Sequence, residues 1–294
     1  IYNFLQLKNN LKDKKALSIE SSDTRVALEY IEERGIDDFL KTSQGMFSIV
    51  FIDLENKEIF FLSDPFCQKP LYYSLQNNIL YFSSDIRTIH FHPNLKKEID
   101  PKVISQFLKK NCIHSPRTIY KNVSKISKGQ KISIKFSGKK FSNINKEIYY
   151  DYNSQIPFSY DHHFSLKQFN ELMLESVEKH LISDVPISVF LSSGLDSSLV
   201  LSLSKQISSN IESHTIGFEI NKFDESNDAQ KISKYLGIKN NQYILNKTDT
   251  LKIIDKLPDI YSEPFSDSSQ IPYNYLCFMT SKNFKGVLCG DGGD

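Results

Sequence analysis

The segment from Ser192 to Ser198 carries side chains suited to phosphate chemistry: a run of serines around Gly194, with one carboxylate at Asp196. Small side chains let a phosphate approach backbone N–H groups, and the hydroxyls of residues such as Ser197 add further donors. Asp196 would repel a bare phosphate, but it could hold a magnesium ion between its carboxylate and phosphate oxygens. The pattern therefore predicts a site for a magnesium-bound phosphate group.

The flanks of this loop indicate the elements that position it. Ile187 to Leu191 form a short apolar run that predicts a buried strand, and apolar residues then recur at helical spacing as far as Ile207. A strand, a small-residue loop and a helix start gather free N–H groups at the positive end of a helix. No Gly-Lys-Ser/Thr follows, so this is not a Walker A loop. The competing interpretation is an ordinary turn in which Ser197 or Asp196 caps the helix.

A second constellation lies at Gly290 to Asp294, where two carboxylates stand in a glycine-rich loop after an apolar run. Ligands of parallel sheets bind at the carboxyl ends of the strands. We therefore expect this loop and Asp196 to face one crevice. Between them in the sequence, Glu263 lies in a polar segment and could serve a substrate ammonium or a proton transfer. The alternative for that segment is a polar loop that caps the following helix.

The first half of the chain predicts an antiparallel sheet with peripheral helices, a layered α+β domain. Helices are expected at 24–34 and at 101–110. Apolar runs separated by turn residues predict strands at 46–52, 59–62, 71–73, 79–82 and 131–136.

From about residue 150, predicted strands alternate with predicted helices, which is typical of a parallel sheet covered by helices. The strands are expected at 187–191, 214–218, 242–245 and 286–289, and the helices at 164–181, after Gly194, and at 228–236. We expect domains at 1–150 and 164–294, joined by a linker at 151–163.

Composition excludes several classes of protein. The 294 residues carry a formal net charge of +1, with 39% hydrophobic and 24% charged residues, as in ordinary globular domains. Near-neutral charge argues against a nucleic-acid partner, and no apolar run approaches membrane-spanning length. Four cysteines without close pairs fit a reducing, cytoplasmic compartment rather than a disulfide framework. Both ends are expected to be internal to a longer protein, because Ile1 enters a patterned segment at once and Asp294 ends a glycine loop.

Several motifs, in order along nearly the whole chain, resemble those of glutamine-hydrolysing asparagine synthetases. The loop at Ser192 is similar to the pyrophosphate loop of ATP pyrophosphatases, which cleave ATP between its α and β phosphates. The matching segments of the first half are Ile1-Tyr2-Asn3, Ser22-Asp23-Thr24, Gly45-Met46-Phe47, Asp64 to Tyr73, and Ser84-Asp85-Ile86. Those of the second half are Ser183 to Pro186, the loop itself, Thr215 to Phe218, Glu263-Pro264-Phe265, and Gly290 to Asp294.

The resemblance implies an N-terminal-nucleophile glutaminase-like domain followed by an α/β ATP pyrophosphatase domain (adenine nucleotide alpha hydrolase-like) with a parallel sheet. It implies that Asp23 holds the amino group of glutamine, that Asp196 and Asp294 hold Mg²⁺, and that Glu263 is the catalytic candidate. The residues expected to bind ATP are Leu191, Ser192, Gly194, Ser197, Ile216, Cys289 and Gly290.

The implied reaction joins aspartate, glutamine and ATP. The aspartate side-chain carboxylate attacks the α-phosphate, pyrophosphate leaves, and ammonia released from glutamine attacks the aspartyl-adenylate to give asparagine and AMP. Small-molecule substrates are therefore the expected partners, and a homodimer is the candidate assembly. The alternatives are an amide ligase for another carboxylate, such as a beta-lactam synthetase-like or peptide-modifying enzyme, an ATP pyrophosphatase that acts on tRNA, and a non-catalytic relative.

Three positions depart from the family pattern. Ser193 stands where glycine is usual, and serine would be strained there if the backbone needs a positive φ. Pro65 and Cys67 stand where the family usually has the arginine and the glycine of an Asp-Arg-Phe-Gly segment. The family nucleophile is an N-terminal cysteine whose own amine acts as the base, and the internal Cys67 and Cys112 cannot replace it. We therefore expect this stretch alone to be inactive as a glutaminase.

Overall fold

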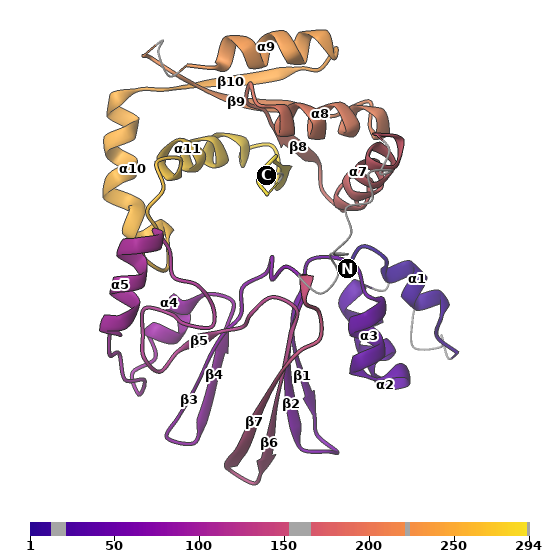
Figure 1. The fold of residues 1–294 in the computed structure, drawn as a ribbon, viewed down its shortest axis with the longest axis vertical. Coiled ribbons are helices and arrows are strands. Elements are labelled where there is room, and N and C mark those ends of the chain that lie inside the picture. The colour runs from indigo at the N-terminus through magenta and orange to yellow at the C-terminus, as the bar shows by residue number, and fades with distance from the viewer. Residues whose placement is uncertain (13–21, 153–165, 221–223, 293–294) are drawn as a thin grey trace. The chain divides into compact units, whose positions relative to one another are not determined.

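The computed structural model describes residues 1–12, 22–152, 166–220 and 224–292, so most of the expected linker at 151–163 lies outside the described residues. The chain divides into two units (Figure 1). Unit 1 comprises Ile1–Tyr160 and Tyr261–Phe265, and unit 2 comprises Asp161–Ile260 and Ser266–Asp294. The short stretch Tyr261–Phe265 thus belongs with the first unit although its neighbours in sequence belong to the second.

Unit 1 is built on two antiparallel sheets. The larger sheet has the order β1-β2-β6-β7, and the smaller has the order β4-β3-β5. Its strands are β1 (Ser48–Asp53), β2 (Glu58–Ser63), β3 (Tyr72–Gln76), β4 (Ile79–Ser83), β5 (Ser124–Lys125), β6 (Gln130–Ser137) and β7 (Lys140–Ile148). Its helices are α1 (Phe4–Asn9), α2 (Asp23–Arg34), α3 (Ile36–Thr42), α4 (Ile86–His90) and α5 (Pro101–Lys110).

Alternation along β2 connects the layers of unit 1. Phe61 belongs to a buried cluster that also contains Tyr73 of the smaller sheet and Ile132 of β6. Its neighbour Leu62 points to the other face, where it joins a cluster with Phe39 of α3. One strand therefore supplies one face to the second sheet and the other face to the helices, as period-two alternation requires.

Local sequence explains several element ends in unit 1. Helix α2 begins after Ser22, whose hydroxyl accepts a hydrogen bond from Arg25 N at 3.3 Å, and ends at Gly35 with a φ of 85°. The hairpin between β3 and β4 turns at Asn77 and Asn78, both in the left-handed region that such a two-residue turn needs.

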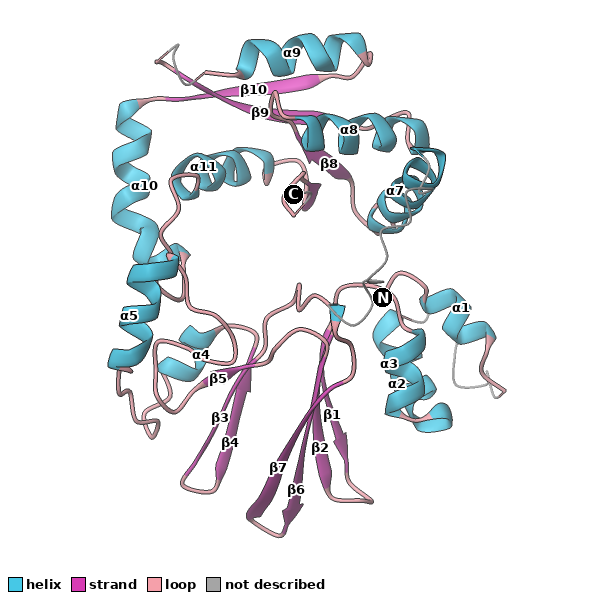
Figure 2. Ribbon diagram, in the orientation of Figure 1, coloured by secondary structure: helices cyan, strands magenta, loops and turns pink. Residues whose placement is uncertain are grey.

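Unit 2 contains a parallel sheet of order β10-β9-β8-β11 (Figure 2). Its strands are β8 (Ile187–Phe190), β9 (Ser213–Phe218), β10 (Asn240–Leu245) and β11 (Gly286–Leu288). Its helices are α7 (Leu166–His180), α8 (Leu195–Ile207), α9 (Ser226–Tyr235), α10 (Lys247–Ile260) and α11 (Gln270–Thr280). The parallel sheet expected from the alternating pattern is confirmed.

Helices α8 and α9 cover one face of this sheet. Val189 of β8, Leu201 of α8 and Ala229 of α9 share a buried cluster. On the other face, Phe190 of β8 packs edge-on against Tyr273 of α11, with ring centroids 5.4 Å apart. Both faces of the sheet are thus covered near the carboxyl end of β8.

The structure adds elements that the sequence patterns do not predict. These are α1, α3, α4, α10, β5 and β7. The sequence of β7, Lys140–Ile148, is largely polar because the strand forms an edge of the larger sheet. The apolar side chains of α7 are only partly covered: Val177 is buried, whereas Leu172 remains exposed. Among the described residues, no helix is both long enough and apolar enough to cross a membrane.

Candidate functional site: a nucleotide-sized cavity in unit 2

The loop after β8 is held together by its own serines. Ser192 and Ser197 hydroxyls lie 2.9 Å apart, and the Ser197 hydroxyl also accepts a hydrogen bond from Ser192 N at 3.2 Å. Gly194 N donates to Ser192 Oγ at 3.1 Å, and Gly194 itself occupies the N-cap of α8 without a side-chain cap. The interpretation of Ser197 or Asp196 as the N-cap is therefore wrong: both lie within the first turn, where the backbone N–H groups lack helical partners.

The glycine-rich loop after β11 lies directly against this helix start. A Cβ atom at Gly290 would lie 2.8 Å from Ser197 N and 3.0 Å from Asp196 Cβ, closer than packed atoms come. Only glycine lets the two backbones approach in this way. The two loops that the sequence analysis placed at one crevice do lie side by side.

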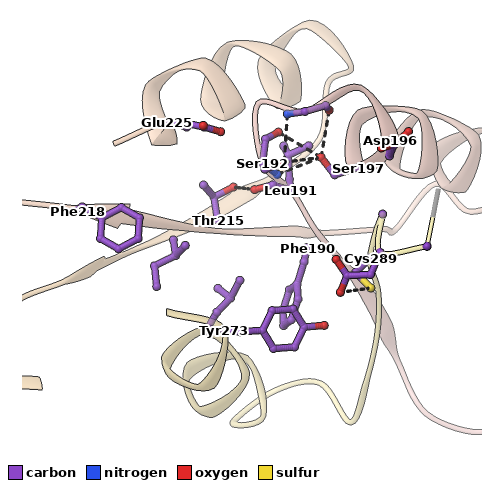
Figure 3. Close-up of a pocket in the computed structure, with 16 residues that line it drawn as sticks. Phe190, Leu191, Ser192, Asp196, Ser197, Thr215, Phe218, Glu225, Tyr273 and Cys289 are labelled. Atoms are coloured by element: carbon purple, nitrogen blue, oxygen red, sulfur yellow. Dashed lines mark hydrogen bonds between the residues drawn. The ribbon is translucent and has the colours of Figure 1, made fainter. Parts of the chain in front are cut away.

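A cavity of about 510 Å³ opens between these loops and α11 (Figure 3). One part of its wall is apolar and aromatic, and the other part is the serine loop. The cavity is lined by Phe190, Leu191, Ser192, Gly194, Asp196, Ser197, Thr215, Ile216, Phe218, Glu225, Tyr273, Leu276, Cys289, Gly290, Asp291 and Gly292. An apolar wall with a few convergent polar groups is typical of a small-molecule site.

The charges at this cavity come from carboxylates. Asp196, Glu225 and Asp291 line it, and none of the described residues that line it is a lysine, arginine or histidine. Beside Asp291, the Cys289 thiol donates to its carboxylate at 3.3 Å, and burial raises the pKa of Cys289. Burial, with the neighbouring Cys289, likewise raises the pKa of Tyr273. At neutral pH both groups are therefore neutral donors rather than anions.

Unit 1 has a pocket of its own at the start of α2. This space of about 620 Å³ is lined by Asp23, Thr24 and Lys69 and by apolar side chains such as Phe47. The Asp23 carboxylate accepts a hydrogen bond from the α-amino nitrogen of Ile1 at 2.8 Å.

The comparisons with known proteins agree with both halves of this description. Residues 1–150 match the family model for the glutamine amidotransferase domain, and residues 168–294 match the model for asparagine synthase. The chain belongs to the glutamine-hydrolysing asparagine synthetase family.

Two curated members of the family match the whole chain. A putative glutamine-hydrolysing asparagine synthetase 2 of Methanocaldococcus jannaschii is 32% identical, and the alignment covers 56% of that protein. Glutamine-hydrolysing asparagine synthetase 1 of Bacillus subtilis is 28% identical, with 45% of it covered. The chain therefore spans about half the length of the curated relatives it matches. A glutamine-dependent NAD+ synthetase from Acinetobacter baumannii, solved with adenosine diphosphate, has a TM-score of 0.34 at 12% identity over 83% of this chain and 50% of that chain, too low to carry an argument.

All seven residues expected to bind ATP line the same cavity, together with Asp196. They are Leu191, Ser192, Gly194, Ser197, Ile216, Cys289 and Gly290. The second expected magnesium ligand, Asp294, lies outside the described residues. Among the described residues, no group of three His, Cys, Asp or Glu side chains converges as a metal site. Asp196 supplies the hard carboxylate oxygen that magnesium prefers, and a nucleotide would supply phosphate oxygens.

Glu263 does not line this cavity. It lies in the Tyr261–Phe265 stretch of unit 1, where its carboxylate accepts hydrogen bonds from Lys125 Nζ and from Ile119 N, both at 3.0 Å, and from the Tyr72 hydroxyl at 3.4 Å. Burial and the nearby Glu263 charge raise the pKa of Tyr72 to about 12. A catalytic role for Glu263 stays a prediction, and these contacts favour a structural role.

The departures from the family pattern have local explanations. Ser193 is not among the described residues with positive φ, so serine carries no left-handed strain there. Cys67, where the family has glycine, does adopt a φ of 54°. Burial raises the pKa of the Cys67 thiol to about 11, which keeps it protonated at neutral pH and agrees with its exclusion as the glutaminase nucleophile.

Eight cavity residues were not among those expected to bind ATP or magnesium: Phe190, Thr215, Phe218, Glu225, Tyr273, Leu276, Asp291 and Gly292. Thr215 and Phe218 flank the predicted Ile216 on β9, so their place at a strand end was a usable signal. Glu225 precedes a predicted helix and was a second usable signal. Tyr273 comes from α11 across the cavity, and only the tertiary structure reveals it.

Proposed function

We propose that the protein to which this chain belongs makes asparagine from aspartate, glutamine and ATP. The observation that carries the proposal is the direct contact between the Ser192–Ser198 loop and Gly290 at one cavity of nucleotide size. The membership of both halves of the chain in the synthetase family supports it.

The ATP half of the reaction fits the cavity wall. The aromatic and aliphatic side chains Phe190, Ile216 and Tyr273 would enclose adenine, and the N–H groups at the start of α8 would receive phosphate oxygens. Asp196, with Asp294 as its expected partner, would hold magnesium, which would neutralise charge on the leaving pyrophosphate. The aspartate carboxylate oxygen bonds to the α-phosphorus while the bond to the bridging oxygen of pyrophosphate breaks.

The glutamine half fits unit 1. Asp23 lines the pocket at the start of α2, and its carboxylate could accept hydrogen bonds from the α-ammonium group of glutamine. The two stacked antiparallel sheets with covering helices fit an N-terminal-nucleophile glutaminase fold, and we include that fold in the proposal. Ammonia from glutamine would attack the acyl carbon of the aspartyl-adenylate, forming the C–N bond while AMP leaves with the C–O electron pair.

Substitution of Asp196 tests the proposal in the natural full-length protein. Asp196→Ala is expected to lower asparagine formation at least 100-fold, because charge on the leaving pyrophosphate loses its counter-ion, while glutamate release from glutamine continues. Asp255→Ala, an exposed aspartate of α10, is the matched control and should retain both activities. The assay follows asparagine, AMP and glutamate by chromatography. Undiminished asparagine formation by Asp196→Ala would contradict the proposal.

A further inference from the structure

Ser193 makes a contact that glycine at this position cannot make. Its hydroxyl donates to Glu225 Oε2 at 2.5 Å, although the two residues are 32 positions apart. Ser193 stands in the loop after β8, and Glu225 stands at the N-cap of α9, beyond β9. The hydrogen bond therefore links the loops that follow two adjacent parallel strands.

The backbone around Glu225 is fixed independently of Ser193. Asp224 Oδ1 accepts hydrogen bonds from Phe218 N at 3.3 Å and from Ser226 N at 3.1 Å. Gln242 Nε2 of β10 donates to Ser226 O at 2.8 Å. Since the main chain is held from both sides, the remaining freedom at this position is that of the Glu225 side chain, and Ser193 restricts it.

The Glu225 carboxylate lines the cavity but suits neither end of a nucleotide. It repels phosphate oxygens, and among the residues that the structure describes no basic side chain lines the cavity to neutralise it. It is equally unsuited to an apolar base. In Figure 3 it lies on the side of Ser192 and Ser197, whereas Phe218 and Tyr273 lie on the other. The part of a nucleotide between base and phosphates is the ribose, whose hydroxyls are neutral hydrogen-bond donors.

The position of Glu225 after strand β9 also favours a ribose as the group that it binds. In dinucleotide-binding α/β folds, an acidic residue beyond the strand next to the phosphate loop accepts a hydrogen bond from a ribose hydroxyl. Glu225 follows β9, which pairs in parallel with β8, the strand that leads into the serine loop. A carboxylate that is held in place before the ligand arrives forms charge-assisted hydrogen bonds at a lower entropic cost.

We propose that Ser193 is a specificity-determining positioning residue, which holds the Glu225 carboxylate where it accepts hydrogen bonds from the ribose hydroxyls of the nucleotide. The inference rests on the proposed ATP site of unit 2. It assigns a use to the serine that distinguishes this chain from the glycine-containing family pattern.

Calorimetric titration of the full-length protein with ATP, 2′-deoxy-ATP and 3′-deoxy-ATP, without aspartate, tests the inference. The wild type is expected to bind ATP about tenfold more tightly than at least one deoxy analogue. Ser193→Ala and Glu225→Gln should each remove most of this preference. Each variant should bind ATP more weakly, whereas its affinity for the deoxy analogue that the wild type binds less tightly should stay unchanged. Ser193→Thr, which keeps the hydroxyl, should restore it. Ser209→Ala, an exposed serine before β9, is the matched control.

A steady-state comparison separates positioning from a general structural defect. Ser193→Ala should raise the KM for ATP about tenfold and leave kcat within about twofold, whereas a folding defect would lower kcat for every nucleotide. Wild-type discrimination in Ser193→Ala would overturn the inference. If the wild type makes no asparagine but shows the expected dependence on the ribose hydroxyls, the proposed function fails and the inference stands.

Discussion

At the scale of single residues, His214 connects the stability of unit 2 to pH. Its imidazole is 1% exposed, stacks on Tyr243 and meets Phe284 edge-on, and its Nε2 has no hydrogen-bond partner among the described residues. Burial lowers the pKa of His214, although the nearby Glu212 acts in the opposite direction. The folded state therefore favours the neutral ring more strongly than the unfolded state does.

The sign of the pH effect follows from linkage. Below the unfolded-state pKa of about 6.5, the unfolded chain binds a proton that folded His214 resists, so this residue lowers stability as the pH falls. His214→Phe should reduce the loss of stability between pH 8 and pH 5.5. At pH 8 it should stabilise unit 2 by about 1 kcal/mol, because it removes an unpaired buried nitrogen.

Urea unfolding followed by circular dichroism at both pH values measures this effect, since the chain contains no tryptophan. Hydrogen exchange of β9 assigns the relevant transition to unit 2. His180→Phe is a control at a histidine of α7 whose Nδ1 lies 2.7 Å from the Ser176 carbonyl oxygen. An identical loss of stability at pH 5.5 in His214→Phe and the wild type would contradict the argument.

Single residues also mark how far the sequence predicts the site. The serine loop and the Gly290 loop are recognisable because their residue types are tied to phosphate chemistry. The sequence does not reveal why residue 290 is glycine. A flexible backbone is one interpretation, whereas the structure shows that the backbone at Gly290 closely approaches Ser197 N. The Ser193–Glu225 contact links residues 32 apart, and no local pattern reveals such a pair.

At the scale of elements, the Tyr261–Phe265 stretch joins unit 1 through Glu263. The Lys125–Glu263 ion pair is largely buried, with side chains 20% and 10% exposed, and the Glu263 carboxylate also accepts hydrogen bonds from Ile119 N and the Tyr72 hydroxyl. Glu263→Gln keeps the shape and can still accept from Ile119 N, but it leaves the Lys125 ammonium without its counter-ion. We expect unit 1 to lose about 2 kcal/mol of stability, less than for a fully buried pair because Lys125 retains some water.

The exposed Lys121–Glu98 pair provides the comparison for this prediction. Its side chains are 48% and 55% exposed, so Glu98→Gln should cost less than about 1 kcal/mol. Both variants are measured by urea unfolding, with hydrogen exchange of β3 reporting unit 1. Equal effects of the two substitutions would show that Glu263 is no anchor and would reopen its catalytic assignment.

Elements with strong periodicity or clear caps were predictable, and polar or short elements were not. Helix α5 matches its predicted bounds because Asp100 caps it and Asn111 ends it in the left-handed conformation. Strand β7 was not predicted, because it is an edge strand with solvent-facing polar residues and a bulge opposite Ile134 and Lys135. No local signal shows that Tyr261–Phe265 belongs to unit 1, because that depends on the contacts of one carboxylate.

At the scale of the whole molecule, each unit has its own core. The buried clusters around Phe39, Phe61 and Ile86 contain residues of unit 1 only, and the cluster around Val189 contains residues of unit 2 only. A ligand stabilises the cooperative body that binds it, by about 2.7 kcal/mol at a hundred times its dissociation constant. The proposed ATP site lies wholly in unit 2, so bound ATP should stabilise unit 2 more than unit 1.

Hydrogen exchange of the full-length protein with and without magnesium and ATP measures where that stabilisation goes. Peptides from β8, α8, β9 and α11 should gain protection, whereas those from β2 and β6 should be unchanged. Gly290→Ala should abolish the gain, because its Cβ would collide with Ser197 N, and Gly286→Ala, whose Cβ meets its nearest neighbour at 3.4 Å, should preserve it. Peptides that span Tyr261–Phe265 test the boundary between the two units. This stretch belongs to unit 1, but the chain continues from it into α11 of unit 2, which carries Tyr273. Protection that spreads equally through β2 and β6 would mean that the two units unfold as one body, and the separation of their cores would then not govern the response to nucleotide.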